Sequence, residues 1–395
     1  MKIACVVNEW PSATETFIRN ELRGLQRCGA QIKIFALQRG PGTDPRQFPV
    51  YYRDEIPARS SLLRPGRMIA SACIGGRMTW TSPIQLIQAT RNIPAAAHFA
   101  RICEREGVQH IHGHFAHTTT DIAIMMARAT GLPVSFSAHA WDVYCTGQIL
   151  WKRLNAAEAC ITCTNAARKH ILAGARPSDR KKVHLIYHGT DLPRFPFIPS
   201  SSISLTPSIL AVGRLVRKKG FHVLIRACHR LKTNLQFQCN IVGSGPQKEA
   251  LRTLIADLGL ENEVQLVGEI PHEDIPRHYR RADLLVMPSI IVEDGDRDGL
   301  PNVVVEAMAS GLPVVGSRLS GIPEAVSHER TGLLCKPDNP AVLSQTIHRM
   351  IHDKELRQSC VHEARKKVET DFDYRLNSEK IHRLFRHLAD GCPPQ

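Results

Sequence analysis

The chain has 395 residues, of which 43% are hydrophobic and 22% are charged. This length favours two domains over a single core, and no apolar run approaches the roughly 20 residues of a membrane-spanning helix. The net charge of +14 and the pI of about 9.4 favour an anionic partner: nucleotide phosphate, nucleic acid or a lipid surface. The first residues, MKIACVVNEW, predict a buried strand rather than a secretory signal. We therefore expect a cytoplasmic protein whose 12 cysteines are free thiols.

Short apolar runs alternate with helix-like segments along the whole chain. Six lie in the first half, at residues 2–8, 31–37, 110–115, 133–139, 159–164 and 183–189. Six more lie in the second half, at residues 208–213, 237–243, 264–269, 283–289, 312–317 and 331–336. Strands that are apolar on both faces and alternate with helices predict parallel sheets. We expect an α/β protein with two doubly wound, Rossmann-like domains that face each other across a cleft.

The Pro- and Ser-rich stretch at 191–208 lacks helical periodicity and predicts the linker between the domains. The expected organisation is a first domain over residues 1–195 and a second domain over residues 196–370. Helical spacing in the tail predicts a last helix, within residues 371–395, that returns to the first domain.

A stretch without acidic residues separates Glu55 from Glu104. It interleaves apolar residues with six arginines, which are Arg59, Arg64, Arg67, Arg77, Arg91 and Arg101. This pattern is typical of an interfacial surface that binds anionic lipid, and also of a solvated basic face on a helical insertion. The sequence leaves both open, and the first would place the protein on the inner face of the cytoplasmic membrane.

Ligands of open α/β sheets bind beyond the carboxyl ends of the strands, so the residues after each run are candidates. In AVGRLVRKKG, Arg214 and Lys219 flank a strand–helix turn, where two cations suit a diphosphate and its developing charge. Arg217 and Lys218 are expected to face solvent. Four glycines at or after strand ends are candidates for close backbone approach to a bound ligand, Gly213, Gly243, Gly245 and Gly268.

The segment DRDGLPNVVVEAMASG predicts a turn that opens a helix. Backbone N–H groups of Leu300, Asn302 and Val303 could hold a sugar or a phosphate there. Asp298 and Glu306 would be two acceptors for polyol hydroxyls. In the alternative interpretation, Asp298 only stabilises the dipole of the helix and Glu306 is a surface residue. This alternative is weakened because the helix is otherwise apolar, so an acid within it needs partners.

In this order, these elements resemble family four of the retaining glycosyltransferases, which have the two-domain GT-B fold. The likeness is densest from Gly213 to Gly332 and is closest to the branch that builds bacterial capsules, exopolysaccharides and lipopolysaccharides. The resemblance implies that Arg214 and Lys219 bind the diphosphate. It further implies that Glu306 holds the ribose, and that the donor sugar is held by Asp298 with the Gly299-Leu300-Pro301 loop. The family's first acid is Glu, so Asp298 is a departure.

Two segments of the first half carry the rest of the resemblance. PVSFSAHAWDVY resembles the strand that ends in an active-site His, which implies that His139 contacts the donor near its anomeric centre, with Asp142 on the same loop. NEWPSATETFIRNEL resembles the opening of the branch and places Asn8 and Thr16 on the acceptor side. It departs from the Gly-Gly loop of many family members.

The run His110, His112, His114 and His117 could be a metal site, but no acid or Cys set accompanies it in the sequence. The resembled fold typically needs no metal, so we predict neither metal nor cofactor and assign His114 to the acceptor side.

The resulting hypothesis is a hexosyltransferase that moves a sugar from a nucleoside diphosphate sugar to a saccharide or lipid-linked saccharide. Retention by front-face attack is what the resemblance implies. The enzyme alternative is a nucleotide-sugar epimerase or a phosphorylase on the same fold. The other alternative is a basic protein that binds membrane or nucleic acid, and the lack of an aromatic-rich motif argues against nucleic acid.

Overall fold

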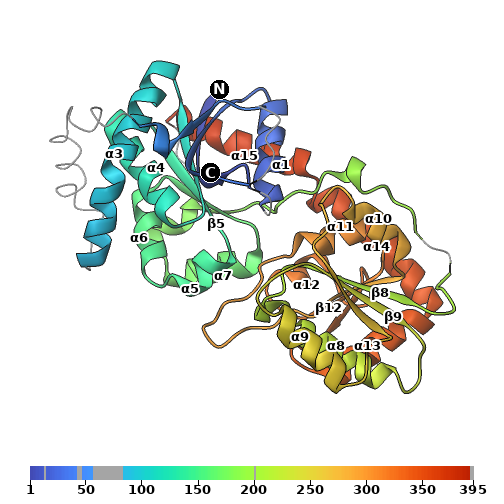
Figure 1. Ribbon diagram of the computed structural model, residues 1–395. Coiled ribbons are helices and arrows are strands. Elements are labelled where there is room, and N and C mark those ends of the chain that lie inside the picture. Colours follow the sequence, from blue (N-terminus) through green and yellow to red (C-terminus); the bar gives the residue numbers. More distant parts are fainter. Residues whose placement is uncertain (13–14, 42–46, 57–82, 200–201, 392–395) are drawn as a thin grey trace. The chain divides into compact units, whose positions relative to one another are not determined.

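The computed structural model describes residues 1–12, 15–41, 47–56, 83–199 and 202–391 (Figure 1). Arg59, Arg64, Arg67 and Arg77 lie outside these residues. The chain divides into two compact units, one made of Met1–Gly189 with Tyr374–Gln395 and the other of Thr190–Asp373. No disulfide joins any of the described cysteines, and most of them are buried. No helix of the described part is both long and apolar enough to cross a bilayer.

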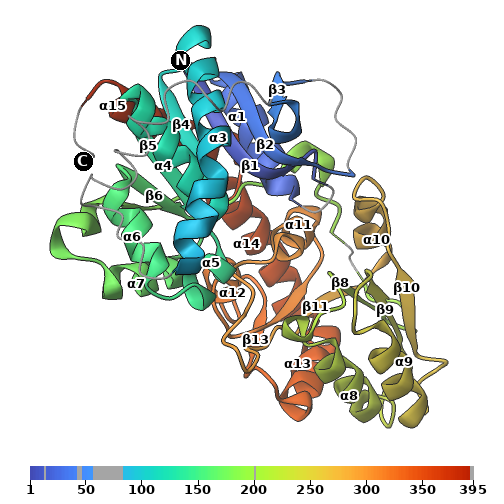
Figure 2. The ribbon, with the colours of Figure 1, turned by 60° about the vertical axis from the view of Figure 1, so that its left-hand side comes forward.

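The first unit contains a seven-stranded sheet in the order β3-β2-β1-β4-β5-β6-β7 (Figure 2). Its paired strands are all parallel. The strands are β1 (Lys2–Trp10), β2 (Gln31–Arg39), β3 (Val50–Tyr52), β4 (His110–His114), β5 (Val134–Ala138), β6 (Ala159–Thr162) and β7 (Val183–Leu185).

Helices cover both faces of this sheet (Figure 1). On one face, α1 (Thr16–Arg27) and α15 (Tyr374–Ala389) bury Ile18, Leu22 and Phe385. The other face packs α3 (Pro83–Glu106), α4 (Thr118–Thr130) and α6 (Ile149–Ala156). The shorter helices α5 (Ala140–Cys145) and α7 (Asn165–Gly174) follow β5 and β6.

The second unit repeats the same plan with six parallel strands in the order β10-β9-β8-β11-β12-β13. They are β8 (Ser208–Val212), β9 (Gln238–Val242), β10 (Val264–Gly268), β11 (Leu284–Met287), β12 (Val314–Ser317) and β13 (Leu333–Cys335). One face carries α8 (Phe221–Leu231), α9 (Lys248–Asp257) and α13 (Pro340–His352) (Figure 1). The other carries α10 (Ile275–Arg281), α11 (Asn302–Ser310), α12 (Ile322–Ala325) and α14 (Lys354–Asp371).

The prediction of two doubly wound α/β domains is confirmed, because both sheets are parallel and are covered by helices on each face. Each predicted apolar run contains a strand, and among the strands of the described residues only the short edge strand β3 was not predicted. Strand order reverses between β1 and β4 in the first unit and between β8 and β11 in the second. In this fold such switch points open the crevice where ligands bind.

The unit boundaries differ from residues 195 and 370, because the predicted linker packs against the second unit. Phe195 is buried, and the Ile198 N–H donates to the Ser310 carbonyl at 3.1 Å. Thr190 bonds to the Phe372 carbonyl at 2.8 Å, so the second unit extends from Thr190 to Asp373. The last helix, α15, packs on the first unit.

Candidate functional site

A cation, a hydroxyl and a carboxylate meet at the switch point of the second unit. Lys219 lies in the turn after β8, and Ser289 and Asp298 lie in the loop after β11. Lys219 Nζ is 3.0 Å from Asp298 Oδ2, and Ser289 Oγ donates to the same oxygen at 2.8 Å. The lysine and aspartate side chains are only 14% and 10% exposed. The two residues therefore form one enclosed ion pair, which the sequence did not predict.

The neighbouring basic side chains differ in exposure. Arg214 is exposed and lines a cavity of about 390 Å³ together with Lys218 and Asp296. The Lys218 side chain is 15% exposed and pairs with Asp296 at 2.9 Å. The expectation that Lys218 faces solvent was wrong, because an acid of the loop after β11 holds it. Arg217 is exposed, as expected.

Two glycine-containing loops pack directly against each other beside this turn. Gly243 has φ +143°, and a Cβ there would overlap the Gly213 carbonyl oxygen. The Leu215 N–H donates to the Ser244 carbonyl at 2.8 Å. These contacts explain why glycine occupies positions 213 and 243. The loop after β9 lies directly against the turn that carries Arg214 and Lys219. Gly245 shares this packing, at φ +152°, whereas Gly268 at φ +92° has open space around it.

Glu306 is 5% exposed on α11 and has two side-chain partners. His272 Nε2 lies 3.1 Å from Oε1, and the Tyr279 hydroxyl donates to Oε2 at 2.8 Å. Burial and then the nearby carboxylate hold the Tyr279 pKa well above its ordinary value, so the hydroxyl keeps its proton. A carboxylate has about four acceptor positions, so Glu306 retains capacity for further hydroxyl groups.

The turn before Glu306 has the form that the sequence predicted. Pro301 is the N-cap of α11, the helix begins at Asn302, and no side chain caps this end. Gly299 and Leu300 are half-buried, and the Gly299 carbonyl accepts the Gly321 N–H at 3.0 Å. Val303 is half-buried, and the residues after it pack into the domain. The N-terminal end of α11 is thus held in place by the packing of the helix's apolar face against the domain.

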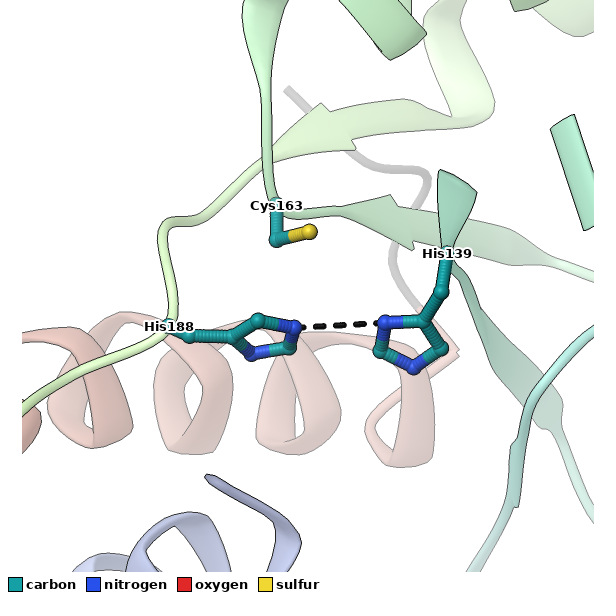
Figure 3. A group of neighbouring side chains, drawn as sticks. All are labelled: His139, Cys163 and His188. Atoms are coloured by element: carbon teal, nitrogen blue, oxygen red, sulfur yellow. Dashed lines mark hydrogen bonds between the residues drawn. The ribbon is translucent and has the colours of Figure 1, made fainter. Parts of the chain in front are cut away.

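In the first unit, His139 lies between the end of β5 and the start of α5, as the N-cap of that helix. Its backbone N–H donates to Asp142 Oδ2 at 2.9 Å, and Asp142 has no exposed surface. Burial raises the pKa of Asp142 to about 6. His139 Nδ1 lies 3.2 Å from His188 Nε2 (Figure 3), and the ring of Phe17 packs 4.3 Å from that of His188. Asp142 therefore holds the backbone of His139, while the imidazole contacts a second His.

The histidines of β4 are enclosed beneath α1 and α15. His112 bonds to Ser135 and Ser137 at 2.8 and 3.0 Å, and Glu21 Oε1 lies 3.8 Å from His114 Nε2. Burial raises the Glu21 pKa to about 8 and lowers the His114 pKa to about 3, so both are neutral near pH 7. His114 has no exposed surface to offer an acceptor.

The other residues assigned to the acceptor side lie nearer the surface. Asn8, in β1, and Thr16, the first residue of α1, are both half-buried. Among the described residues, two groups could hold a metal ion, Glu21 with His112 and His114, and His139 with Cys163 and His188. The sequence analysis missed Glu21, Cys163 and His188, although His188 directly precedes Gly189 at the end of a predicted run.

Solved glycosyltransferases share the two-sheet architecture. A glycosyltransferase from Rickettsia africae superposes with a TM-score of 0.76 at 19% identity, covering 98% of each chain. HepE from Anabaena, in complex with UDP, gives a TM-score of 0.75 at 19% identity, over 98% of this chain and 100% of its own. The fold is therefore the GT-B fold of glycosyltransferases.

Family models match each half of the chain. The family described as "Glycosyltransferase Family 4" matches residues 14–194, and "Glycosyl transferases group 1" matches residues 200–367. Each half of the chain therefore resembles a glycosyltransferase domain, and the two matches follow one another within residues 14–367.

Curated relatives come from bacterial polysaccharide synthesis. The putative colanic acid biosynthesis glycosyltransferase WcaL of Escherichia coli is 35% identical over 53% of this chain and 52% of its own length. The amylovoran biosynthesis glycosyltransferase AmsK of Erwinia amylovora is 36% identical over 53% and 52%. The chain thus spans about half the length of these two relatives. WcaL of Salmonella typhimurium aligns over 98% of this chain and 100% of its own length, at 25% identity.

Proposed function

We propose that this glycosyltransferase moves a sugar from a nucleoside diphosphate sugar to a saccharide or lipid-linked saccharide acceptor during synthesis of a cell-surface polysaccharide. The observation that carries the proposal is the Lys219–Asp298–Ser289 group beside Arg214, at the switch point of the second unit. The names of the relatives support the pathway, since they assign one to amylovoran biosynthesis and, as a putative enzyme, the other to colanic acid biosynthesis. HepE supports the donor class, since it was solved with UDP and with UDP-glucose.

The chain's own side chains supply the electrostatics of the transfer. Arg214 and Lys219 neutralise the diphosphate as the bond to the sugar breaks, which is the step where charge develops. Glu306 accepts hydrogen bonds from the ribose hydroxyls, held for this by Tyr279 and His272. Asp298 and the backbone from Gly299 to Asn302 hold the sugar. His139 is assigned the contact near the anomeric carbon.

The proposed reaction retains the anomeric configuration. The acceptor hydroxyl attacks the face from which the diphosphate leaves, and a donor phosphate oxygen takes the hydroxyl proton. Because protein cations neutralise the leaving group, no Mg²⁺ or Mn²⁺ is required at the diphosphate. The enzyme works in the cytoplasm, where nucleotide sugars are made, or at the inner face of the membrane.

A donor screen tests the proposal. The full chain is incubated with UDP-, GDP-, ADP- and dTDP-sugars, with and without saccharide acceptors, and nucleoside diphosphate release is measured. We expect release that rises when an acceptor is added and that is unchanged by Mg²⁺, with the product linkage assigned by NMR. Conversion of a donor to its epimer without acceptor, or a requirement for free phosphate, would instead establish one of the enzyme alternatives.

A further inference from the structure

Three side chains converge where neighbouring strands of the first unit end. His139 follows β5, Cys163 follows β6 and His188 follows β7 (Figure 3). One ligand atom from each, a ring nitrogen or the sulfur, lies within 4.8 Å of the others. The two imidazoles present nitrogens to each other at 3.2 Å, with the thiol beside them. Three adjacent strand ends thus present three metal-binding atoms to one point.

We propose that His139, Cys163 and His188 bind a divalent ion of the zinc class. Two imidazoles and a thiolate are ligands that such an ion prefers. Nitrogens bound to one tetrahedral zinc at about 2.0–2.1 Å stand about 3.3 Å apart, close to the spacing found here. A zinc-bound thiolate would stand about 3.6 Å from each nitrogen. Because the three ligand atoms lie within 4.8 Å of one another, the sulfur needs to move closer by about 1.2 Å at most.

The surroundings of the group suit an ion better than those of the second histidine cluster. His139 and His188 are half-buried, and Phe17 and Phe115 pack their rings 5.0 and 4.5 Å from that of His139. Three protein ligands leave a fourth position for water or a substrate oxygen, as in open zinc sites.

The second cluster, Glu21 with His112 and His114, is a poorer site. Both nitrogens of His112 are already engaged by Ser135 and Ser137, and the cluster is fully enclosed. It provides no sulfur ligand and no open position. The sequence analysis predicted no metal in this protein, but the candidate ligands that it weighed were His110, His112, His114 and His117. None of the three ligands proposed here belongs to that run, so the proposal departs from that prediction.

An ion on Nδ1 would also fix the tautomer of His139. The proton then resides on Nε2, which becomes a hydrogen-bond donor of fixed direction. This consequence rests on the proposed function, in which His139 contacts the donor sugar. The metal site itself does not depend on that function.

Cobalt substitution tests the site without measuring activity. The metal-free full chain is titrated with Co²⁺ and then Zn²⁺, following absorbance and bound metal per chain. We expect one equivalent, tetrahedral cobalt bands with a thiolate charge-transfer band, and proton release as the thiol ionises. Cys163→Ala should abolish the charge-transfer band, and His188→Asn should weaken Zn²⁺ binding at least tenfold.

Matched variants identify the ligands. Cys28→Ala removes a thiol elsewhere in the same unit, and His114→Gln alters the enclosed cluster; both should keep the cobalt spectrum. Circular dichroism and thermal unfolding check that each variant is folded, and calorimetry with UDP, GDP, ADP and dTDP checks that the donor domain of each variant binds the same nucleotide as the wild type. Absence of stoichiometric binding by the folded wild type would overturn the proposal. So would a spectrum that survives Cys163→Ala or disappears in His114→Gln. The donor screen can fail or succeed independently of these results.

Discussion

The ammonium group of Lys219 is assigned two interactions: an ion pair with the enclosed carboxylate of Asp298, and a contact with the diphosphate of the proposed donor. The ammonium pairs with Asp298 at 3.0 Å. Removing it therefore leaves a carboxylate with little exposure and no counter-charge, which costs stability as well as catalysis. Loss of activity alone would not separate these effects.

A pair of variants separates them. Lys219→Ala should lower kcat by about 10²–10³-fold, the usual effect of removing one group that stabilises developing charge, and should lower the unfolding midpoint. Adding Asp298→Asn should recover the midpoint but not the turnover. Lys218→Ala, which breaks the neighbouring pair with Asp296, is the matched control and should keep most of the turnover. Near-wild-type turnover of folded Lys219→Ala would contradict the assigned role.

The two acids should respond differently to the two parts of the donor. Glu306→Gln should weaken binding of the nucleoside diphosphate itself, because ribose contacts exist without the sugar. Asp298→Asn should spare that binding and reduce affinity for the complete nucleotide sugar. Isothermal calorimetry with both ligands measures the difference, and equal losses in both variants would refute the division of roles. Tyr279→Phe controls for loss of the hydroxyl that holds Glu306.

His110 should make the first unit sensitive to acid. Burial lowers its pKa to about 3, whereas an unfolded histidine titrates near 6.5. Between these values the unfolded chain binds more protons, so stability is lost as the pH falls below about 6.5. His110→Leu should remove about 2 kcal/mol of the loss between pH 7 and pH 5. Urea unfolding at both pH values measures this, and wild type and variant should show the same change between pH 7 and pH 8.

At the scale of elements, the loops that follow β8 and β9 act as one packed unit. Gly243 permits this because any side chain there would meet the Gly213 carbonyl. The turn that carries Arg214 and Lys219 therefore depends on a residue that need not touch the donor.

Gly243→Ala should consequently separate the two loops. We expect the second unit to lose about 1–3 kcal/mol of stability from the strained φ, and more because the Gly213 carbonyl must move. Binding of nucleoside diphosphate should become weaker as well. Gly268→Ala is the matched control, because its φ is also positive but its surroundings are open. The measurements are unfolding and calorimetry; equal effects of the two substitutions would show that φ strain alone matters.

The strands were predictable because each is a short apolar run bounded by polar or Gly-rich residues. The strand β3 was not, since it has three half-buried residues and pairs only with β2. The linker was misplaced because a Pro-rich composition does not reveal that Phe195 is buried.

In the candidate site, Lys219, Asp298 and Glu306 follow strands and could be found by position. Their partners Ser289, His272 and Tyr279 have no distinguishing pattern, and Cys163 and His188 become notable only when three strand ends converge.

At the scale of the whole molecule, the excess of positive charge extends to the stretch between Glu55 and Glu104. Several basic residues near an anionic surface contribute about 1 kcal/mol each, which suffices for reversible adhesion. We propose that this stretch brings the enzyme to a lipid-linked acceptor.

Vesicle co-sedimentation tests the adhesion. Binding to anionic vesicles should decrease with added salt, and neutral vesicles should bind little. Replacing Arg59, Arg64, Arg67 and Arg77 with Ser should abolish binding while donor affinity stays intact. Vesicle binding that survives the four replacements would place the contact elsewhere, and no binding by the wild type would favour a soluble acceptor.

The position of α15 has a consequence for the order of synthesis. Ile381 and Phe385 of this helix pack with Ile18 and Leu22 of α1, yet they leave the ribosome after every residue of the second unit. The second unit is continuous in sequence and can fold as soon as it emerges. The first unit, although translated first, is completed last, and until then the apolar face of α1 is left for a chaperone to shield.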